Sequence, residues 1–426
     1  MSNIDPVIND PKVSEDERIG ALTAYMEKGP PLPAFSGEIN NHIHTIYSFS
    51  PYTPSMAALK AREAGLEAAG SVDHDSYAGA SEMRRACGIL GLGCVTGFEI
   101  RVSVKHTEFA DRKLNSPDSK GISYMTIQGV PGTAASMVKE FLAPVSAARA
   151  ERNRRMVKNL NDIITNSGLS ALSYENDVVP LSMSAKGGSV TERHILYALS
   201  LKLISEAGKG EDLLNYLKEK LKLDVSGKIR TLLEDKDNLY YAWDLLGVLK
   251  SSFNEKVFIQ PNTDECPPVE KATAFAHSIN AVPSYAYLGD IGESVTGDKK
   301  AEKFEDDFLD TLIPRLKDFG FLGLTYMPPR NTAAQLERLH KLCVQHSFLE
   351  ISGVDINTPR QTFNCPEIRR PEFSLLVDST WALLAHETLS GADNTRGFFN
   401  PKDPLAAKPL EERIAAFAKL GRDAIK

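Results

Sequence analysis

Four short stretches of this sequence carry histidines and carboxylates of the kind that bind a metal ion. They are His-Ile-His at 42–44, Val-Asp-His-Asp at 72–75, Gly-Phe-Glu-Ile at 97–100 and, far downstream, Ser-Gly-Val-Asp-Ile-Asn at 352–357. Each is joined to an apolar run typical of a buried strand. Because the carboxyl ends of parallel strands meet at one end of a sheet or barrel, the four stretches predict one hydrolytic metal centre.

His42 and His44 are the first two candidate ligands. On an extended segment, residues i and i+2 face the same side, so two neutral imidazoles can bind one ion. Taken alone, such a pair is also typical of surface histidines or of core histidines with hydrogen-bond partners.

Glu99 and Asp355 are the candidate carboxylate ligands, since each follows an apolar strand. A carboxylate in that position is costly to bury unless it is paired or bound to a metal. The alternative for Glu99 is an ion pair with Arg101 or another arginine. The alternative for Asp355 is a turn or helix cap before Pro359.

His74 lies between Asp73 and Asp75. Neighbouring carboxylates are the groups that orient a metal-bound imidazole, while a solvated turn at a strand end is the plain alternative. An imidazole beside carboxylates also titrates in the range useful for proton transfer.

The elements expected to position these residues alternate between strand and helix. Strands are predicted at 66–72, 93–100, 281–286, 322–326 and 349–354, and helices at 56–64, 80–90, 269–280, 304–319 and 333–346. Two longer helical segments, 147–166 and 194–207, interrupt the alternation, and a final amphipathic helix is predicted near 409–420. This pattern favours an α/β fold with parallel winding.

The pattern also divides the chain. We expect an N-terminal arm at 1–35, a barrel made of 36–133 and 250–370, a helical insertion at 134–249, and a C-terminal extension at 371–426. The net charge of -7 gives no long-range attraction to nucleic acid or anionic lipid. Five scattered cysteines without a Cys-x-x-Cys pair, and the absence of a leader or a long apolar span, favour a cytoplasmic protein.

The metal-binding stretches resemble the PHP (polymerase and histidinol phosphatase) family, in its branch of small metal-dependent phosphoesterases. Residues 38–48, 58–75 and 97–100 look like its first three motifs, and residues 286–289, 326–346 and 353–357 are similar to the later ones. The resemblance implies a distorted (β/α)7 barrel with a helical insertion subdomain.

Several positions depart from the family pattern. Phe49 stands in place of an aspartate, Tyr287 and Asn357 stand in place of histidines, and no histidine occurs at 124 or 125. In the family, the residues matching His42, His44, Glu99 and Asp355 share one ion. The resemblance therefore implies one divalent ion per chain, Zn²⁺, Fe²⁺ or Mn²⁺. It also releases His74, with Asp73 beside it, for catalysis.

The insertion extends the resemblance. Residues 147–160 and 191–199 look like the family's arginine-rich helix and its histidine-containing segment. His194 matches the family histidine, but Glu192 stands where an arginine is usual and Arg193 is displaced by one.

Two functions follow, and both expect a small-molecule ligand and leave the oligomeric state open. The first is a phosphoesterase that acts on a small phosphorylated molecule through a metal-activated water. The residues expected to bind its substrate are Arg193, His194, Arg330, Tyr47 and Tyr287. The second is a divergent protein without phosphatase activity that acts on or binds an uncharged molecule, which the aromatic residues Phe49, Tyr124 and Tyr287 favour.

Overall fold

Seven strands form one sheet, and their order in space is their order along the chain. The structure, a computed structural model, describes residues 5–292 and 301–425, so residues 1–4 of the expected arm and 293–300 of the expected barrel lie outside the described residues. The strands are β1 (Ile39–Ile43), β2 (Ala68–His74), β3 (Gly93–Ser103), β4 (Ile122–Gln128), β5 (Val282–Ala286), β6 (Gly323–Tyr326) and β7 (Leu349–Ser352).

The sheet curls until its two edges meet. Beyond β7, the backbone of Ile356 accepts from the N–H of His44 at 2.9 Å and donates to the carbonyl of His42 at 3.1 Å. The Asn40 side chain completes the seam, since it accepts from the N–H of Val354 at 2.9 Å and donates to its carbonyl at 3.0 Å. The result is a nearly closed seven-stranded α/β barrel, which confirms the expected fold class.

The barrel is distorted at β4. This strand runs antiparallel to both β3 and β5, whereas the other neighbouring strands are parallel. Uniformly parallel winding is therefore wrong at this strand. The segment 104–121 that leads into β4 contains no helix, and a parallel neighbour requires a longer crossover, usually helical.

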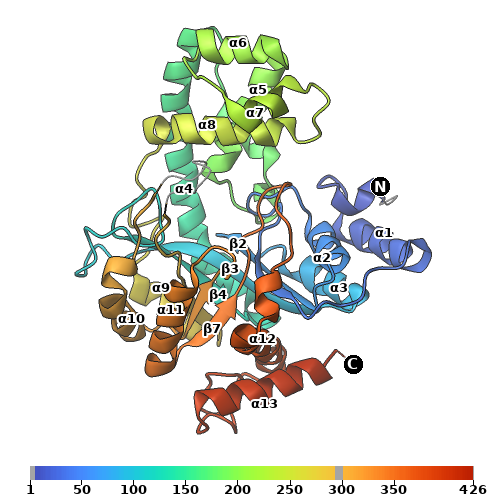
Figure 1. The fold of residues 1–426 in the computed structure, drawn as a ribbon, viewed down its shortest axis with the longest axis vertical. Helices are drawn as coiled ribbons and strands as arrows, with labels where there is room; N and C mark the ends of the chain where they lie inside the picture. Colours follow the sequence, from blue (N-terminus) through green and yellow to red (C-terminus); the bar gives the residue numbers. More distant parts are fainter. Residues whose placement is uncertain (1–4, 293–300, 426) are drawn as a thin grey trace.

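Helices cover the outside of the barrel (Figure 1). They are α2 (Pro54–Glu63), α3 (Ala80–Leu90), α9 (Val269–Ser278), α10 (Leu309–Asp318) and α11 (Ala333–His346). The helix expected from residue 304 begins only at Leu309, after a short 3₁₀ turn at Asp306–Phe308. Residues 304–306 instead hold the loop after β5, since the N–H of Leu288 donates to Glu305 and the N–H of Phe304 donates to Asp290.

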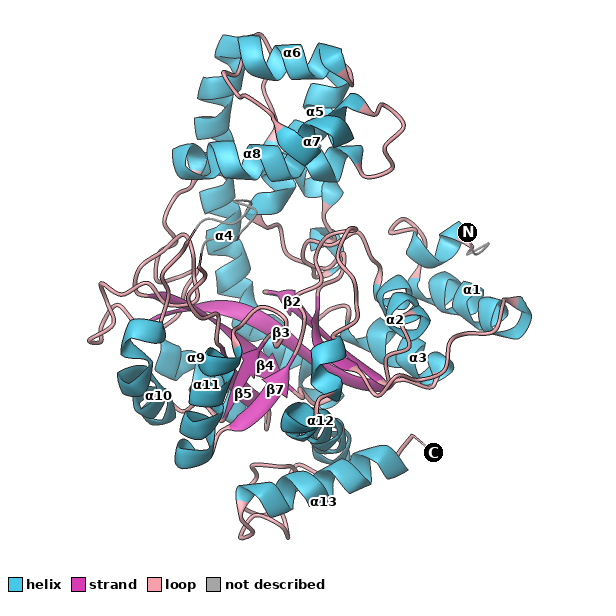
Figure 2. Cartoon of the chain, in the orientation of Figure 1, coloured by secondary structure: helices cyan, strands magenta, loops and turns pink. Residues whose placement is uncertain are grey.

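A helical region joins β4 to β5 and stands over one end of the barrel, as Figure 2 shows. Its helices are α4 (Ala135–Ile164), α5 (Glu192–Ala207), α6 (Glu211–Glu219), α7 (Gly227–Glu234) and α8 (Tyr241–Val257). The helix α4 belongs to both parts, because Val138 and Leu142 pack in the barrel core whereas Leu160 and Ile164 pack in the core of the helical region. The domain boundaries expected near 133 and 249 stay predictions.

Both ends of the chain pack on the barrel. The C-terminal helix α12 (Ser374–Ala392) places Leu383 in a cluster with Val95, Val282 and Leu349, near the amino ends of their strands, and α13 (Leu410–Asp423) packs on α12. This arrangement closes the barrel end opposite the helical region.

The N-terminal segment, which the sequence suggested was a polar arm, contains α1 (Glu15–Lys28). It begins at a capping box between Ser14 and Glu17 and is fixed to α3 by a buried ion pair between Arg18 and Glu82 at 2.5 Å. Among the described residues, no helix combines the length and apolar character needed to cross a bilayer.

Candidate metal centre

The predicted ligands come together at the carboxyl end of the barrel, beneath the helical region. His42 lies in β1 and His44 directly after it, His74 ends β2, Glu99 lies in β3, and Asp355 follows β7. The register of β2 and β3 places His74 opposite Glu99. Residues that are more than 300 positions apart in the chain thus become neighbours because the barrel closes.

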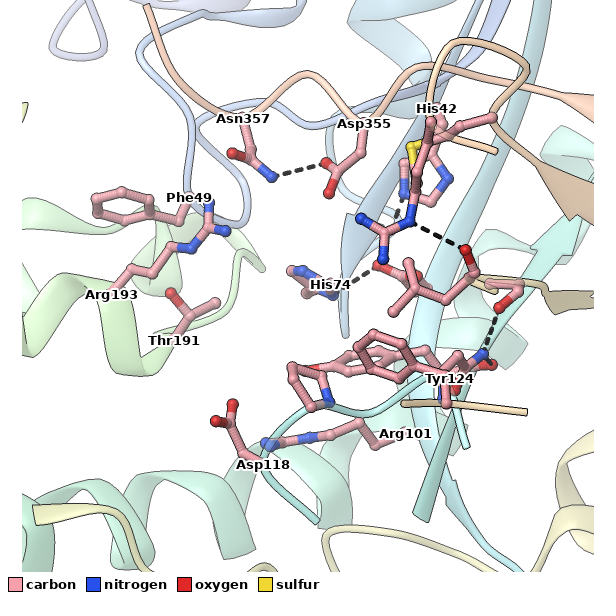
Figure 3. A pocket seen from close by; sticks show the side chains of 18 of the residues that line it. His42, Phe49, His74, Arg101, Asp118, Tyr124, Thr191, Arg193, Asp355 and Asn357 are labelled. Carbon is pink, nitrogen blue, oxygen red and sulfur yellow. Dashed lines mark hydrogen bonds and ion pairs between the residues drawn. The ribbon is translucent and has the colours of Figure 1, made fainter. Parts of the chain in front are cut away.

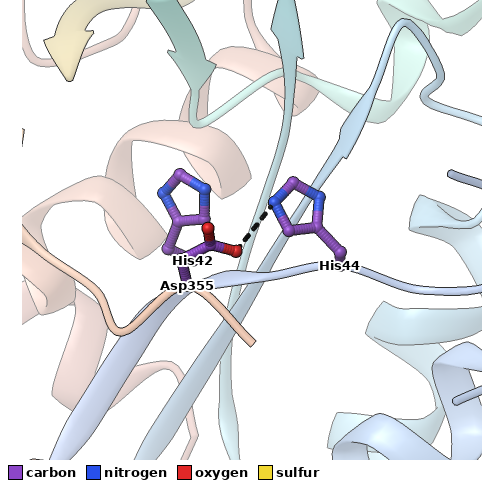
Figure 4. A group of neighbouring side chains, drawn as sticks. All are labelled: His42, His44 and Asp355. Atoms are coloured by element: carbon purple, nitrogen blue, oxygen red, sulfur yellow. Dashed lines mark ion pairs between the residues drawn. The ribbon is translucent and has the colours of Figure 1, made fainter. Parts of the chain in front are cut away.

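The distances among these side chains fit a divalent ion. Nε2 of His42 and Nε2 of His44 each lie 3.8 Å from Oε2 of Glu99, and Nε2 of His44 lies 3.2 Å from Oδ1 of Asp355 (Figure 4). Two ligands bound tetrahedrally at the usual bond lengths stand about 3.4 Å apart. The observed separations bracket that value. Among the described residues, the ligand atoms that lie within 4.8 Å of one another form two groups that share His44, namely His42, His44 and Asp355, and His44, His74 and Glu99.

The contacts of Glu99 and Asp355 do not match the alternative interpretations, an ion pair with an arginine for Glu99 and a turn or helix cap for Asp355. Arg101 pairs with Glu192 and Glu265 instead of Glu99. The carboxylate of Asp355 faces His44 and accepts from the side-chain amide of Asn357 at 2.7 Å. Both carboxylates therefore face the histidines.

The electrostatics keep Glu99 ionised. Burial alone would raise its pKa, but the charge of His74 and the hydrogen bond and charge of His42 outweigh burial and hold the pKa well below its ordinary value. Burial and the neighbouring His74 lower the pKa of His44. Burial would lower the pKa of His42, but its contact with Glu99 and the charge of Asp355 outweigh burial and raise it. A metal requires the carboxylate and the neutral imidazole, so binding an ion would have to oppose the shift at His42.

His74 stands between the metal ligands and the open space above them. Its Nδ1 lies 2.9 Å from Oε2 of Glu99, and its ring stacks on that of His44 with 4.5 Å between centroids. Its side chain is 28% exposed, against 2% for His44 and 11% for His42. With His44 and Glu99 it forms a second group able to hold an ion, so its expected role in catalysis stays a prediction.

Asp73 has a different environment from the one expected of a catalytic residue. Its Oδ1 accepts from the N–H of Thr45 and the hydroxyl of Ser48, both at 2.6 Å, and its Oδ2 accepts from the hydroxyl of Thr45 at 2.5 Å. Its side chain holds the loop that follows His44 and does not line the cavity at the site.

The glycine of the last stretch is required by close packing. A Cβ atom at Gly353 would lie 2.4 Å from Cβ of His42 and 2.7 Å from its backbone nitrogen. A larger residue would displace His42, so this glycine permits the approach of β1 and the segment after β7.

A cavity of about 400 Å³ opens beside the ligands, between the barrel and the helical region. Figure 3 shows His74, Tyr124, Asp355 and Arg193 around it, contributed by both parts of the fold. Phe49 also lines the cavity, and its ring packs against His194 of the helical region at 4.9 Å between centroids.

Three cations in this wall have no carboxylate within ion-pair distance among the described residues. They are Arg193, at the start of α5, Lys250, in α8, and Arg330, whose Nε is hydrogen-bonded to a backbone carbonyl. The pKa of Lys250 is lowered, first by the charge of Arg193 and then by burial. Sequence reasoning missed Lys250, although a lysine after the apolar run at 245–249 was an available signal.

The other predicted substrate residues divide into two pairs. Arg330 and Tyr287 line the cavity, but Nε of Arg330 donates to the carbonyl of Leu288 at 3.0 Å and the hydroxyl of Tyr287 donates to Asp306 at 2.6 Å.

His194 and Tyr47 do not line the cavity. His194 is buried, which lowers its pKa to about 3, and its Nδ1 accepts from the N–H of Thr191 at 3.0 Å. Tyr47 is also buried, and its carbonyl accepts from the N–H of Ser189. The structure therefore does not favour direct contact between a ligand in this cavity and the side chain of His194 or Tyr47.

Two solved structures resemble the fold over most of the chain. One, from Bifidobacterium adolescentis and provisionally described as a metal-dependent phosphoesterase, is 20% identical, with a TM-score of 0.49 over 80% of this chain and 96% of that one. The other, an amidohydrolase from Chromobacterium violaceum with sulfate bound and no metal, is 15% identical, with the same TM-score and coverage. No model of a protein family and no curated protein matches this chain. At these values neither likeness assigns a function, which depends on the site itself.

Proposed function

We propose that this protein is a metal-dependent hydrolase that cleaves a phosphoester of a small molecule. The observation that carries the proposal is the convergence of His42, His44, Glu99 and Asp355 at the base of one cavity. In the wall of this cavity, Arg193 and Lys250 have no carboxylate within ion-pair distance among the described residues. The resemblance of the same residues to the PHP family agrees with it.

Those four residues are the ones that would hold the ion. When bound, a divalent cation supplies Lewis-acid polarisation of the scissile group and lowers the pKa of a water ligand. A mixed set of imidazole and carboxylate donors suits Zn²⁺, Fe²⁺ or Mn²⁺. We propose one ion per chain, because His44 belongs to both possible ligand groups.

His74 is proposed as the general acid or base. It is the most exposed of the three histidines and lines the cavity, so it can exchange a proton with a ligand. Its contact with Glu99 fixes the orientation of its ring, which proton transfer at a defined position requires.

Arg193 and Lys250 are proposed to bind the phosphoryl group. Both face the cavity, and the charge of Asp355 acts on both of them, which places the two cations near the ligand set. Cations without a protein counter-ion in a partly buried wall suit an anionic ligand, because the ligand then supplies the missing charge.

The test is elemental analysis of the protein purified without added metal, beside a Glu99→Ala variant. About one transition metal per chain, lost in the variant, supports the proposal and justifies a screen of phosphoesters. The control is Glu302→Gln, which changes another carboxylate of the cavity wall that contacts Lys113. Two ions would contradict the single-ion site, and no metal after reconstitution would contradict the hydrolase.

A second candidate is a protein that acts on or binds an uncharged molecule. The observation that favours it is the pairing of the cavity arginines Arg101 and Arg149 with Glu192, which removes two cations from those available to a phosphate. Retained metal together with no turnover of any phosphoester would favour this candidate.

A further inference from the structure

Three arginines and three carboxylates form a buried cluster at the join of barrel and helical region. Arg101 comes from β3, Arg149 and Arg152 come from α4, and their partners are Asp75, Glu192 and Glu265. With every member ionised, the cluster carries no net charge. Removing one carboxylate would leave an arginine charge without compensation, which is costly in a buried site unless a ligand replaces it.

Glu192 and Glu265 share the same arginines but differ in position. Glu192 contacts Arg101 at 3.0 Å and Arg149 at 3.5 Å and pairs with Arg152. Glu265 pairs with Arg101, lies 3.4 Å from Arg149, and lies 2.5 Å from Nε of Arg152.

Only one of these two glutamates reaches the cavity. Glu192 lines it, with a side chain that is 19% exposed, whereas Glu265 is 1% exposed and lies outside the lining. Arg101 and Arg149 line the cavity as well. The carboxylate of Glu192 therefore occupies the cavity side of two arginines that would otherwise face the ligand.

We propose that Glu192 is a specificity-determining residue that limits the ligand to one anionic group. That group binds at Arg193 and Lys250, which have no carboxylate partner among the described residues, while Glu192 satisfies Arg101 and Arg149 and repels a second anionic group. The preferred ligand class is thus a monoester with an uncharged body, and bisphosphorylated molecules are excluded. This deepens the proposed function, on which the identity of the anionic group as a phosphoryl group rests.

The physical basis is electrostatic repulsion at short range between Glu192 and a second anionic group. A second phosphate entering beside Arg101 would meet the carboxylate of Glu192, and like charges in a partly buried site repel strongly. Glutamine in place of Glu192 has nearly the same shape and removes only the charge. The arginines would then be left with one fewer negative partner, and a ligand anion could take its place.

The experiment measures binding of inorganic phosphate and of pyrophosphate by calorimetry, in the presence of EDTA. We expect Glu192→Gln to raise the affinity for pyrophosphate relative to phosphate by about tenfold. The matched control is Glu265→Gln, which removes a charge from the same arginines outside the cavity and should leave the ratio unchanged. An unchanged ratio in Glu192→Gln, or an equal rise in Glu265→Gln, would overturn the proposal.

A second measurement covers the case in which Glu192→Gln does not fold, as judged by its thermal transition. We expect the wild type, which keeps the charge of Glu192, to bind pyrophosphate no more tightly than phosphate, and clearly tighter binding of pyrophosphate would overturn the proposal. Both probes lack an ester, and EDTA removes free metal. The expected shift in a protein that binds no metal would therefore refute the hydrolase and leave the charge selection intact.

Discussion

Oε2 of Glu99 lies 2.9 Å from Nδ1 of His74 and 3.8 Å from Nε2 of both His42 and His44. One carboxylate oxygen thus faces three imidazoles, which come from β1, from the residue directly after it, and from the end of β2. Burying a carboxylate without a positive partner is costly. The position of Glu99 therefore favours either a cation bound among the three rings or at least one protonated imidazole.

This relationship gives a test of the role of His74. We expect His74→Asn to retain its metal with less than about a tenfold loss of affinity, but to lose about 100- to 10,000-fold in turnover of a phosphoester. The reason is that a general acid or base acts on the chemical step, whereas a ligand acts on binding. Metal titration and steady-state kinetics on the same preparation separate the two, and loss of metal in parallel with activity would make His74 a ligand.

A second prediction concerns the loop that carries Asp355. Gln361 holds this loop, accepting from the N–H groups of Asn357 and Thr358 at 2.8 Å and donating to the carbonyl of Asp355. Next to it, Arg360 donates to Oδ1 and Oδ2 of Asp244 in the helical region, each at 2.7 Å.

We expect Arg360→Ala to weaken metal binding about three- to tenfold, because the loop loses its anchor to α8. The effect is modest because the arginine is partly exposed and such pairs contribute little individually. Calorimetric titration with Mn²⁺ measures the change, and exchanging the charges in the double variant Asp244→Arg with Arg360→Asp should recover part of it. Equal metal affinity in Arg360→Ala and the wild type would show that the anchor does not reach Asp355.

The third prediction concerns Lys250. Replacing it with methionine should raise KM for a phosphoester about tenfold and reduce the salt dependence of KM, because the cavity wall loses a cation that has no carboxylate partner among the described residues. Lys256→Met is the matched control, since Lys256 is exposed on the same helix and outside the cavity. Equal effects of the two substitutions would point to general surface charge in place of a phosphoryl contact.

The fourth prediction concerns stability and pH. Burial raises the pKa of Glu305 to about 7, and the neighbouring Asp306 adds to the rise. Between its ordinary value and about 7, the folded state binds more protons at this residue than the unfolded state. The free energy of unfolding should therefore fall as pH rises through that interval.

Chemical denaturation from pH 4.5 to pH 8 tests this, using the difference between the wild type and Glu305→Gln. We expect the wild type to lose up to about 3 kcal/mol relative to the variant across the interval. A difference that does not vary with pH would show that Glu305 has an ordinary pKa in the folded protein.

The sequence by itself determined the α/β class and most of the elements that build the barrel. Its apolar runs and helical periodicity located β3, α3 and α11 closely, because these elements bury one face and their patterns are local. It also identified His42, His44, Glu99 and Asp355 as candidate ligands. Polar or charged side chains at the end of a buried strand are costly to bury unless a partner or a metal ion binds them.

The tertiary structure decided which side chains meet and which are already paired. The antiparallel course of β4 and the closure of β1 on the segment after β7 depend on backbone pairing between distant segments, which no local pattern records. For the same reason, the pairing of Glu192 with three arginines, the capping role of His194 and the exposure of Lys250 to the cavity could not be read from residue types. The chemistry of each residue is local and visible in the sequence. Whether a charged side chain has a partner, and which residue that partner is, depends on the folding that brings distant segments together.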